Sequence, residues 1–491
     1  MNEPAASSSP ITVFAIGFAF MRAWGLTYLG NNGVRFPLET MADISLLAFA
    51  PTLLTSLGLL AWFANQGSID ILSRNSIIVG GALTCASGLL MSMGVDLFFT
   101  AEIIGGVGYA LLLLQWGVVS SYVSFRRLTS SLMAGLPVAG LVCVVLCFVP
   151  TPALPVVFSL FGPASSWCIA RMASRLQRDN NPEINLSTGE NATASNDQTW
   201  SASGRKLLAR MVIALFLLEL VGRSTLMLSG EFAVRVVGAP SYSFALARFA
   251  GTLGAALLYT VFVARSKRPL RIVYLLTPVL LIASCLFIIF GQLGLSHITY
   301  SLAFSAGAWL ETAFWLFFSH SFKKIGRSPV YVWAWGRGAF WFSTLVGVVL
   351  WTLQSTLFEN GVIYNGDALT TLIVLLALVA MFTYTVVLPE SAVASLGIMR
   401  DRDMDDPAVQ SDFDEIARIL ATEAKLSPRE TEVFLLLAHG RDTSFIQDKL
   451  IISQGTVCSH RDRIYRKLGV HSKRELIDLV DGALRNRASR A

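Results

Sequence analysis

Seven charged side chains interrupt the long apolar segments of this 491-residue chain. They are Arg22, Glu102, Glu219, Arg223, Arg248, Glu311 and Arg337. A charge at the centre of a bilayer costs about 3 kcal/mol on insertion scales, so such side chains usually face the interior of a helix bundle. Arginine neutralises a carboxylate or phenolate, and glutamate neutralises an amine. Two interpretations remain open: an ion-pair network that only holds helices together, or a polar pocket for a small molecule.

Tryptophan and glutamine side chains accompany these charges along the chain. The neighbours are Gln115 with Trp116, Trp309 and Trp315 around Glu311, and Trp333 and Trp335 before Arg337. Tryptophan rings stack on ligands, although tryptophans near the end of a span also anchor it at the membrane interface. A small polar aromatic or amphipathic molecule would suit such a pocket. The predicted ligand-binding residues are Arg22, Gln115, Glu219, Arg223, Arg248, Trp309, Glu311, Trp333 and Arg337.

A second polar set lies near the C-terminus, on a helix that Ser453 is expected to cap. Val457, Ile464 and Leu468 form its buried face, so the polar residues between them point outward into a DNA groove or toward phosphates. Asp462 is suited to accept a hydrogen bond from cytosine N4. The predicted DNA-binding residues are Thr456, Cys458, Ser459, Asp462, Arg463, Arg466 and Lys467, of which Thr456, Arg463 and Lys467 suit phosphate contacts.

The sequence shows no pattern typical of catalysis. The six cysteines have no metal-ligand spacing, and five of them lie in apolar segments. No glycine-rich phosphate-binding loop is present. We therefore predict no catalytic residues, no metal site and no cofactor.

Composition places most of the chain in lipid. Hydrophobic residues make up 54% and charged residues 14%, whereas soluble domains carry about 25% charged residues. A membrane-spanning helix needs about 20 apolar residues. Twelve such runs are expected, at 11–30, 44–64, 76–94, 97–120, 129–149, 152–171, 208–229, 241–264, 271–291, 298–320, 329–353 and 368–388. The long loop at 172–206 divides them into six plus six.

The basic residues between these runs predict an orientation. The loops after even-numbered runs carry Arg74, Arg126, Arg127, Arg171, Arg175, Arg178, Arg205, Lys206, Arg265, Lys267, Arg268, Arg271, Lys323, Lys324 and Arg327. The loops after odd-numbered runs carry little besides Arg35 and Arg235. Because basic loops stay in the cytoplasm, both termini and the 172–206 loop are predicted to be cytoplasmic, in a bacterial inner membrane.

This topology resembles the major facilitator architecture. The resemblance implies that the first, fourth, seventh and tenth spans line a central cavity, with the eighth and eleventh beside it. Those spans carry the seven charges. The family usually marks the loop between its second and third spans with a Gly-x-x-x-Asp-Arg-x-Gly-Arg-Arg-like motif. Here residues 64–74 match that motif poorly, which argues against transport and leaves binding open.

An acidic linker at 391–423 follows the membrane domain of residues 1–390. Residues 400–425 hold eight acidic and four basic residues, whereas 426–491 hold eight acidic and twelve basic. Such a linker is either a solvated connector or a mask for the basic module behind it. Phe413, Ile416, Ile419 and Leu420 have helical spacing, which predicts a short amphipathic helix.

Residues 424–491 resemble the LuxR-type, or NarL-type, helix-turn-helix domain. The resemblance rests on 426–430 (Leu-Ser-Pro-Arg-Glu), Gly440, 453–457 (Ser-Gln-Gly-Thr-Val), His460 and 464–470 (Ile-Tyr-Arg-Lys-Leu-Gly-Val). Ser427 and Glu430 have the spacing of a capping box at the start of the first helix, and a short second helix is expected at 442–450. The resemblance implies four helices, DNA binding as a dimer on inverted repeats, and dimer contacts at 473–484. Cys458 and Asp462 stand where the family often has basic residues, which puts its base contacts in doubt. A module that lost DNA and binds protein is the alternative.

The sequence thus predicts an all-α chain: a membrane bundle of about twelve spans followed by a four-helix DNA-binding domain. The leading hypothesis is a membrane-bound one-component transcription regulator that senses a small molecule and binds promoter DNA. The first alternative is a transporter that also regulates its own operon. A transporter whose tail binds protein is the second.

Overall fold

The computed structural model describes residues 10–28, 42–66, 70–91, 93, 97–178, 202–237, 241–264, 266, 269–290, 295–359, 366–394, 407–438, 446–447, 450 and 452–488. These residues form helices and turns, with no β-strand among them, so the predicted all-α fold is confirmed. The chain divides into two compact units, Met1–Asp401 and Arg402–Ala491.

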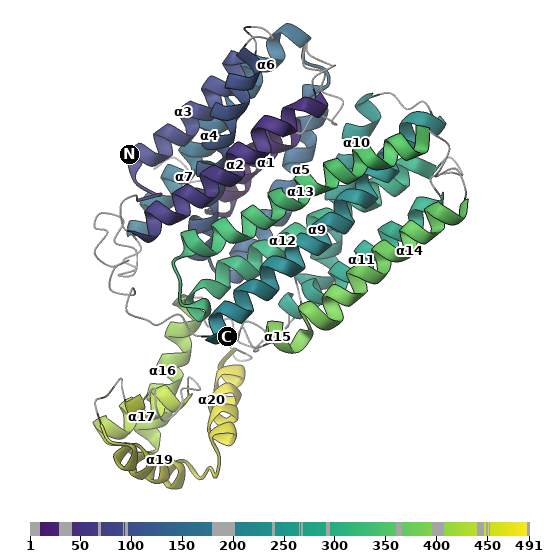
Figure 1. Cartoon of the computed structure of the whole chain (residues 1–491). Coiled ribbons are helices and arrows are strands. Elements are labelled where there is room, and N and C mark those ends of the chain that lie inside the picture. Colours follow the sequence, from purple (N-terminus) through teal and green to yellow (C-terminus); the bar gives the residue numbers. More distant parts are fainter. Residues whose placement is uncertain are drawn as a thin grey trace. The chain divides into compact units, whose positions relative to one another are not determined.

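The first half of the membrane unit places a helix over each of the first six apolar runs (Figure 1). These are α1 (Pro10–Tyr28), α2 (Ala42–Asn65), α3 (Arg74–Leu90), α4 (Phe98–Ser121), α5 (Phe125–Leu146) and the sixth, broken run. That run consists of a 3-10 turn (Thr151–Ala153), α6 (Leu154–Ser159) and α7 (Phe161–Arg178). Pro163 lacks the amide that would bond the carbonyl of Ser159, so the helix ends and restarts there.

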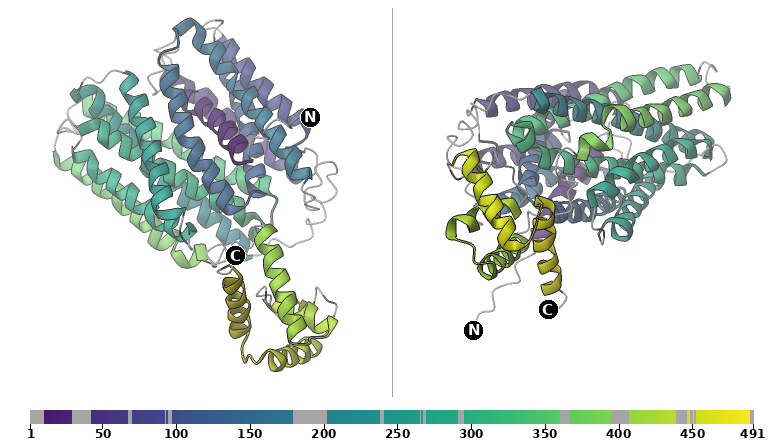
Figure 2. Two further views of the ribbon diagram at one scale, coloured as in Figure 1. Left: turned by 180° about the vertical axis from the view of Figure 1, so that it is seen from behind. Right: turned by 90° about the horizontal axis from the view of Figure 1, so that it is seen from below.

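The second half repeats this plan. Its helices are α9 (Ala202–Val237), α10 (Ser241–Leu258), α11 (Pro269–Phe290), α12 (Ser296–Ile325), α13 (Pro329–Glu359), α14 (Gly366–Phe382) and the short α15 (Glu390–Ala394). Helices α10 and α14 continue into π-helical turns at Tyr259–Val263 and Thr383–Val387. The halves lie side by side, with α2 against α13 and α5 against α10 (Figure 2).

The helices differ in how far they are enclosed. Seven segments within the described residues are long and apolar enough to cross a membrane by themselves. The buried share of the apolar window is largest on α4 and α12, at 83% and 78%, and smallest on α10 and α11, at 39% each. Helices α4 and α12 therefore lie inside the bundle, and α10 and α11 present an apolar outer face. The number of spans, twelve, stays a prediction.

The second unit has its own hydrophobic core. It contains α16 (Pro407–Glu423), α17 (Pro428–Ala438), α19 (Gln454–Leu468) and α20 (Lys473–Ala488). Phe413 and Ala417 of α16 pack with Phe434 of α17 and Leu476 of α20. The amphipathic helix predicted in the linker is therefore part of the C-terminal unit. Of the helix predicted at 442–450, only residues 446, 447 and 450 lie within the described residues, and all three are helical.

Candidate functional site

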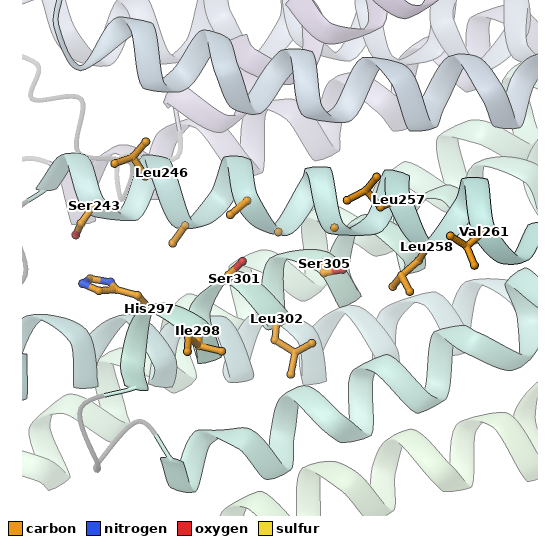
Figure 3. A pocket seen from close by; sticks show the side chains of 14 residues that line it. Ser243, Leu246, Leu257, Leu258, Val261, His297, Ile298, Ser301, Leu302 and Ser305 are labelled. Atoms are coloured by element: carbon orange, nitrogen blue, oxygen red, sulfur yellow. The ribbon is translucent and has the colours of Figure 1, made fainter.

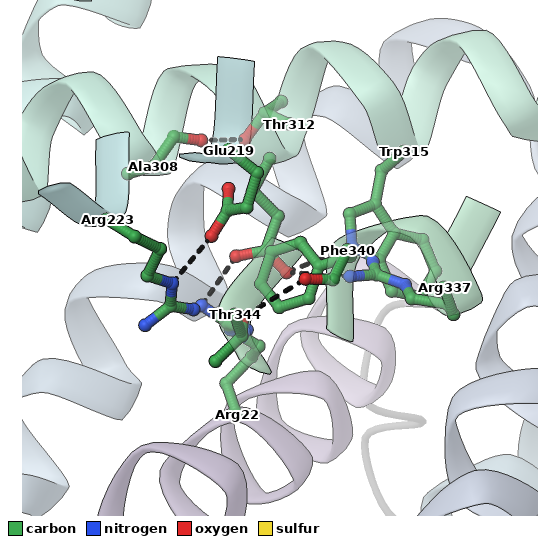
Figure 4. A network of polar contacts seen from close by, with 10 residues as sticks. Arg22, Glu219, Arg223, Ala308, Thr312, Trp315, Arg337, Phe340 and Thr344 are labelled. Carbon is green, nitrogen blue, oxygen red and sulfur yellow. Dashed lines mark hydrogen bonds and ion pairs between the residues drawn. The ribbon is translucent and has the colours of Figure 1, made fainter. Parts of the chain in front are cut away.

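Glu311 is the centre of a buried ionic cluster in the membrane unit. Figure 4 shows other side chains of this cluster, among them Arg22, Glu219, Arg223 and Arg337. Oε2 of Glu311 lies 2.5 Å from Nη2 of Arg22 on α1. Its Oε1 accepts from Nη1 of Arg337 on α13 at 3.3 Å and from Nε1 of Trp315, one helical turn away, at 3.3 Å. One carboxylate thus joins helices from both halves of the bundle.

A second ion pair belongs to the same cluster. Glu219 and Arg223 are one turn apart on α9, and Arg223 Nε donates to Glu219 Oε1 at 2.8 Å. The ring of Phe340 lies 5.3 Å from the Arg223 guanidinium and 5.4 Å from the Arg337 guanidinium. Phe340 therefore contacts both ion pairs through cation–π interactions.

Aromatic rings enclose the Arg337 guanidinium. It lies 4.3 Å above the Trp315 ring and 5.5 Å from Trp333, and those two indoles have centroids 4.3 Å apart. Trp333 also joins α13 to α4: its Nε1 donates to Ser121 Oγ at 3.1 Å, and its ring packs where a Cβ on Gly117 would lie only 2.6 Å away. Only glycine at position 117 leaves room for this indole.

The cluster has one more positive than negative side chain. Arg22, Arg223 and Arg337 face Glu219 and Glu311, so the sum is one excess positive charge when all five are ionised. The adjoining cavity has a volume of about 10 Å³, which is room for a single water molecule. An organic molecule does not fit in this cavity unless the surrounding helices separate.

The structure brings together six of the nine predicted ligand-binding residues and places three elsewhere. Gln115 faces α3, where its Nε2 donates to Ser76 at 3.4 Å. Trp309 is two residues before Glu311 on α12, so its side chain points in a direction about 200° around the helix axis from that of Glu311. Arg248 is buried on α10 over the ring of Phe304.

Two cluster residues are absent from the predicted set, although a signal for each exists. Trp315 follows Glu311 by four residues and Phe340 follows Arg337 by three. These are the spacings that put two side chains on one helix face. Glu102, the seventh predicted charge, is buried near the start of α4.

A larger pocket lies outside the cluster, between α10 and α12 (Figure 3). Its volume is about 810 Å³, and its lining is almost wholly apolar. Leu257, Val261 and Ile298 at its rim are more than half exposed. The pocket therefore opens on the outer face of the bundle rather than toward Glu311.

The second candidate site is the outward face of α19. Ser453 caps the helix, its Oγ accepting from the amide of Thr456 at 3.3 Å. Val457 and Ile464 are buried, as predicted. Thr456, Ser459, Asp462, Arg463 and Arg466 are exposed, and Cys458 is half-buried. Gly469, in the left-handed conformation with φ 66°, ends the helix.

Lys467 has a structural partner that the sequence analysis missed. Its Nζ lies 2.7 Å from Oε2 of the buried Glu430 and 3.0 Å from the carbonyl of Lys425. Glu430 also accepts from the amide of Ser427 at 2.9 Å, in the predicted capping box. Lys467 and these hydrogen bonds lower the pKa of Glu430 to about 2. The predicted phosphate contact of Lys467 therefore competes with an ion pair inside the unit.

Asp462 is also paired. Nη2 of the adjacent Arg461 lies 3.0 Å from its Oδ1, and this carboxylate raises the pKa of Arg461. The pair is solvent-exposed, so a base can replace either partner at little cost. The free cationic groups of the exposed face are then Arg463 and Arg466.

Residues 424–480 match the family of bacterial regulatory proteins of the LuxR family. The C-terminal unit carries a LuxR-type DNA-binding domain. The chain is 45% identical over 58 residues to the Fimbriae Z protein of Escherichia coli K12. It is 37% identical over 70 residues to the uncharacterized response regulatory protein YgeK of that strain. The matches cover 12% and 14% of this chain, and 28% and 48% of those relatives.

The part before the LuxR-type domain has the fold of major facilitator transporters. The proton:xylose symporter XylE matches with a TM-score of 0.52 at 15% identity, over 77% of this chain and 94% of its own. The human organic anion transporter MFSD10 matches with a TM-score of 0.52 at 14% identity, over 76% of this chain and 98% of its own. A bacterial homologue of the iron transporter ferroportin matches with a TM-score of 0.51 at 12% identity, over 76% of this chain and 99% of its own. At these identities the likeness defines the fold alone, that of a polytopic membrane protein.

Proposed function

We propose that this protein is a membrane-bound one-component transcription regulator. Its major-facilitator-like bundle senses a small molecule, and its LuxR-type domain binds promoter DNA from the membrane. The observation that carries the proposal is the covalent union of these two units in one chain. A membrane bundle that takes no part in regulation would not require a fused DNA-binding domain. A DNA-binding domain does not by itself require a membrane bundle with an internal ionic cluster.

The sensing site is the cluster around Glu311. A ligand that separates α1, α12 and α13 replaces the ion pairs of Arg22 and Arg337 with contacts of its own. The excess positive charge favours a molecule with an acidic or phenolic group, and the indoles of Trp315 and Trp333 favour an aromatic body. A ligand shifts the bundle only in so far as it binds the open and closed states with different affinity.

The output is the occupancy of a promoter by two copies of the LuxR-type domain. Both termini lie on the cytoplasmic side of a bacterial inner membrane. Two copies of the domain pair through residues 473–484 and together bind an inverted repeat. Leu476 and Val480 of this segment are buried in the domain's own core, whereas Leu479 is exposed and available to a second copy. Two domains held at one membrane have a high effective concentration, so bundle association promotes pairing.

A transporter that also regulates its own operon is the second candidate, because the bundle has a transporter fold. Uptake by vesicles that contain the purified protein separates the two. With an inducing compound as substrate, a regulator gives uptake equal to that of empty vesicles. Concentrative uptake, blocked by Glu311→Gln, would establish the hybrid.

Arg463 and Arg466 are expected to supply phosphate contacts. Removing both from the fragment 402–491 should weaken DNA binding at low salt. The slope of log K against log salt concentration should become shallower by about 1–2, because each phosphate contact contributes about 0.9 to its magnitude. Arg418→Ala on α16, also exposed, is the matched control and should leave the slope unchanged. Equal slopes for all three proteins would remove α19 from the DNA interface.

Asp462 is expected to select a base rather than add affinity. Asp462→Ala should change which promoter sequences are enriched in a binding selection, with a loss of about 1–3 kcal/mol of discrimination at one base pair. Thr456→Ser is the control, since it keeps the hydroxyl at the helix N-terminus. An unchanged sequence preference would limit Asp462 to its pair with Arg461.

A further inference from the structure

Arg248 differs from the three arginines of the ionic cluster. Arg22 and Arg337 share Glu311, and Arg223 pairs with Glu219. The side chain of Arg248 is almost completely buried at 1% exposure, and its Nε and Nη1 have no hydrogen-bond partner among the described residues. The contact that it makes is with the ring of Phe304, 4.7 Å from the guanidinium carbon.

An unpaired guanidinium in this position is costly. Arginine stays protonated in proteins, so it cannot escape the cost of burial by losing its charge. A cation–π contact offsets only part of the hydration free energy that the guanidinium loses on burial. Buried charges are otherwise paired or bound to an ion. An anion bound to the Arg248 side chain would therefore stabilise it.

The surroundings of Arg248 are aromatic. The rings of Phe304 and Tyr300 are tilted to each other with centroids 5.3 Å apart, and the Tyr300 and Phe244 rings have centroids 5.1 Å apart. These residues form a small apolar cluster of their own, separate from the main core. An anion that binds Arg248 thus meets phenyl rings on one side, which favours an apolar body over a fully hydrated inorganic ion.

This arginine lies where the two halves of the bundle meet. Its helix packs on α5 so closely that a Cβ on Gly140 would lie 3.1 Å from the Cα of Phe249. On the other side, a Cβ on Gly251 would lie 2.3 Å from the carbonyl oxygen of Ser301 on α12. Gly251 and Ser301 line the apolar pocket on the outer face, and Arg248 is not among its lining residues.

Arg248 also lies in line with the ionic cluster. Phe304 precedes Glu311 by seven residues, two turns of α12, which places both on one face about 10 Å apart. The same stripe continues through Trp315. A molecule bound at Arg248 therefore lies against the interior wall that ends at Glu311.

We propose that Arg248 is the anchor of a second binding site, for the carboxylate of a small organic monoacid with an apolar body. The acid binds between α5, α10 and α12 at the junction of the halves after these helices move apart, because the close contacts at Gly140 and Gly251 leave no room for it in this conformation. The guanidinium donates to the carboxylate, and Phe304 and Tyr300 contact the body. This site rests on the geometry of the bundle alone and stands whether or not the protein regulates transcription.

Binding of sodium benzoate to the purified full-length protein in detergent tests the proposal. Benzyl alcohol, a neutral molecule of the same shape, and sodium chloride are the comparison probes. Wild type should bind benzoate at least about tenfold more tightly than benzyl alcohol, the size expected for one charge-assisted hydrogen bond. Arg248→Gln should abolish this preference, Arg248→Lys should keep part of it, and the exposed Arg127→Gln should keep all of it.

Three outcomes would overturn the proposal. Equal affinity of wild type for benzoate and benzyl alcohol would show that no charge is recognised. Competition by chloride that is complete and depends on Arg248 would make the site one for inorganic ions. An undiminished preference in Arg248→Gln would assign benzoate to another arginine. Should Arg248→Gln fail to fold, a reduced preference in folded Arg248→Lys would support the site, and full retention with unchanged affinity would contradict it.

Discussion

Glu311→Gln is expected to lower the stability of the membrane unit by about 3–5 kcal/mol. The change leaves the buried Arg337 and the partly buried Arg22 without their shared carboxylate. Thermal unfolding of the purified protein in detergent measures the effect as a lower midpoint, and the amount of folded protein in the membrane should fall with it. In any variant that remains folded, the response to an inducer should be lost.

Glu390→Gln is the matched control for Glu311→Gln. Glu390 also pairs with an arginine, Arg271, but both side chains are 44% exposed. Exposed pairs contribute about 0–1 kcal/mol. The double variant Glu311→Gln with Arg337→Met should recover part of the loss, because it removes one of the two unpaired charges. Equal midpoints for Glu311→Gln and Glu390→Gln would show that the cluster does not hold the helices together.

The stability of the fragment 402–491 is expected to fall as the pH drops below 4.5. The folded-state pKa of Glu430, about 2, lies below its ordinary value of 4.5. Its contribution is therefore complete above pH 4.5 and is lost as the pH falls through 2. Glu430→Gln should cost about 1–3 kcal/mol at pH 7, the loss expected for a buried charged hydrogen bond. Chemical denaturation at a series of pH values measures both.

The control for Glu430 lies two residues away. Glu432 pairs with Arg429, and both side chains are nearly half exposed, so Glu432→Gln should change stability little and keep the wild-type pH dependence. Lys467→Met should destabilise the fragment as Glu430→Gln does. The account fails at this point if Lys467→Met weakens DNA binding while stability and its pH dependence stay unchanged, since Lys467 would then be a phosphate contact only.

Much of the fold follows from local patterns in the sequence. Each predicted apolar run lies on a helix, and the capping box at Ser427 and Glu430 forms as expected. The reason is that span length and capping depend on residues a few positions apart. The broken sixth run was harder to place, because three prolines and the restart at Pro163 fall within 14 residues.

The candidate site was only partly predictable, because neighbours in sequence are not neighbours in space. Trp309 and Glu311 are two residues apart and lie on different sides of α12, whereas Trp315 lies on the side of Glu311. Gln115 was predicted from its proximity to Trp116, but it contacts α3. The pairing of Arg22 with Glu311 depends on how α1 and α12 pack, which no local pattern in the sequence encodes.

The same limit applies to the LuxR-type domain. The exposed face of α19 followed from its helical period. The partner of Lys467 did not, because Glu430 lies 37 residues earlier and was expected only as a cap. A charged side chain on a recognition helix was interpreted as a phosphate contact, and the structure adds a buried carboxylate within its reach.

The central claim, that the intact protein regulates promoters from the membrane, is tested most directly by chromatin immunoprecipitation of the full-length protein, compared with the Arg463→Ala/Arg466→Ala variant at equal abundance in the membrane fraction. The account predicts discrete chromosomal sites for the wild-type protein, altered transcript levels of the adjacent genes, and loss of both in the variant. Equal recovery of DNA by the two proteins, with no enriched site and no changed transcript, would contradict it.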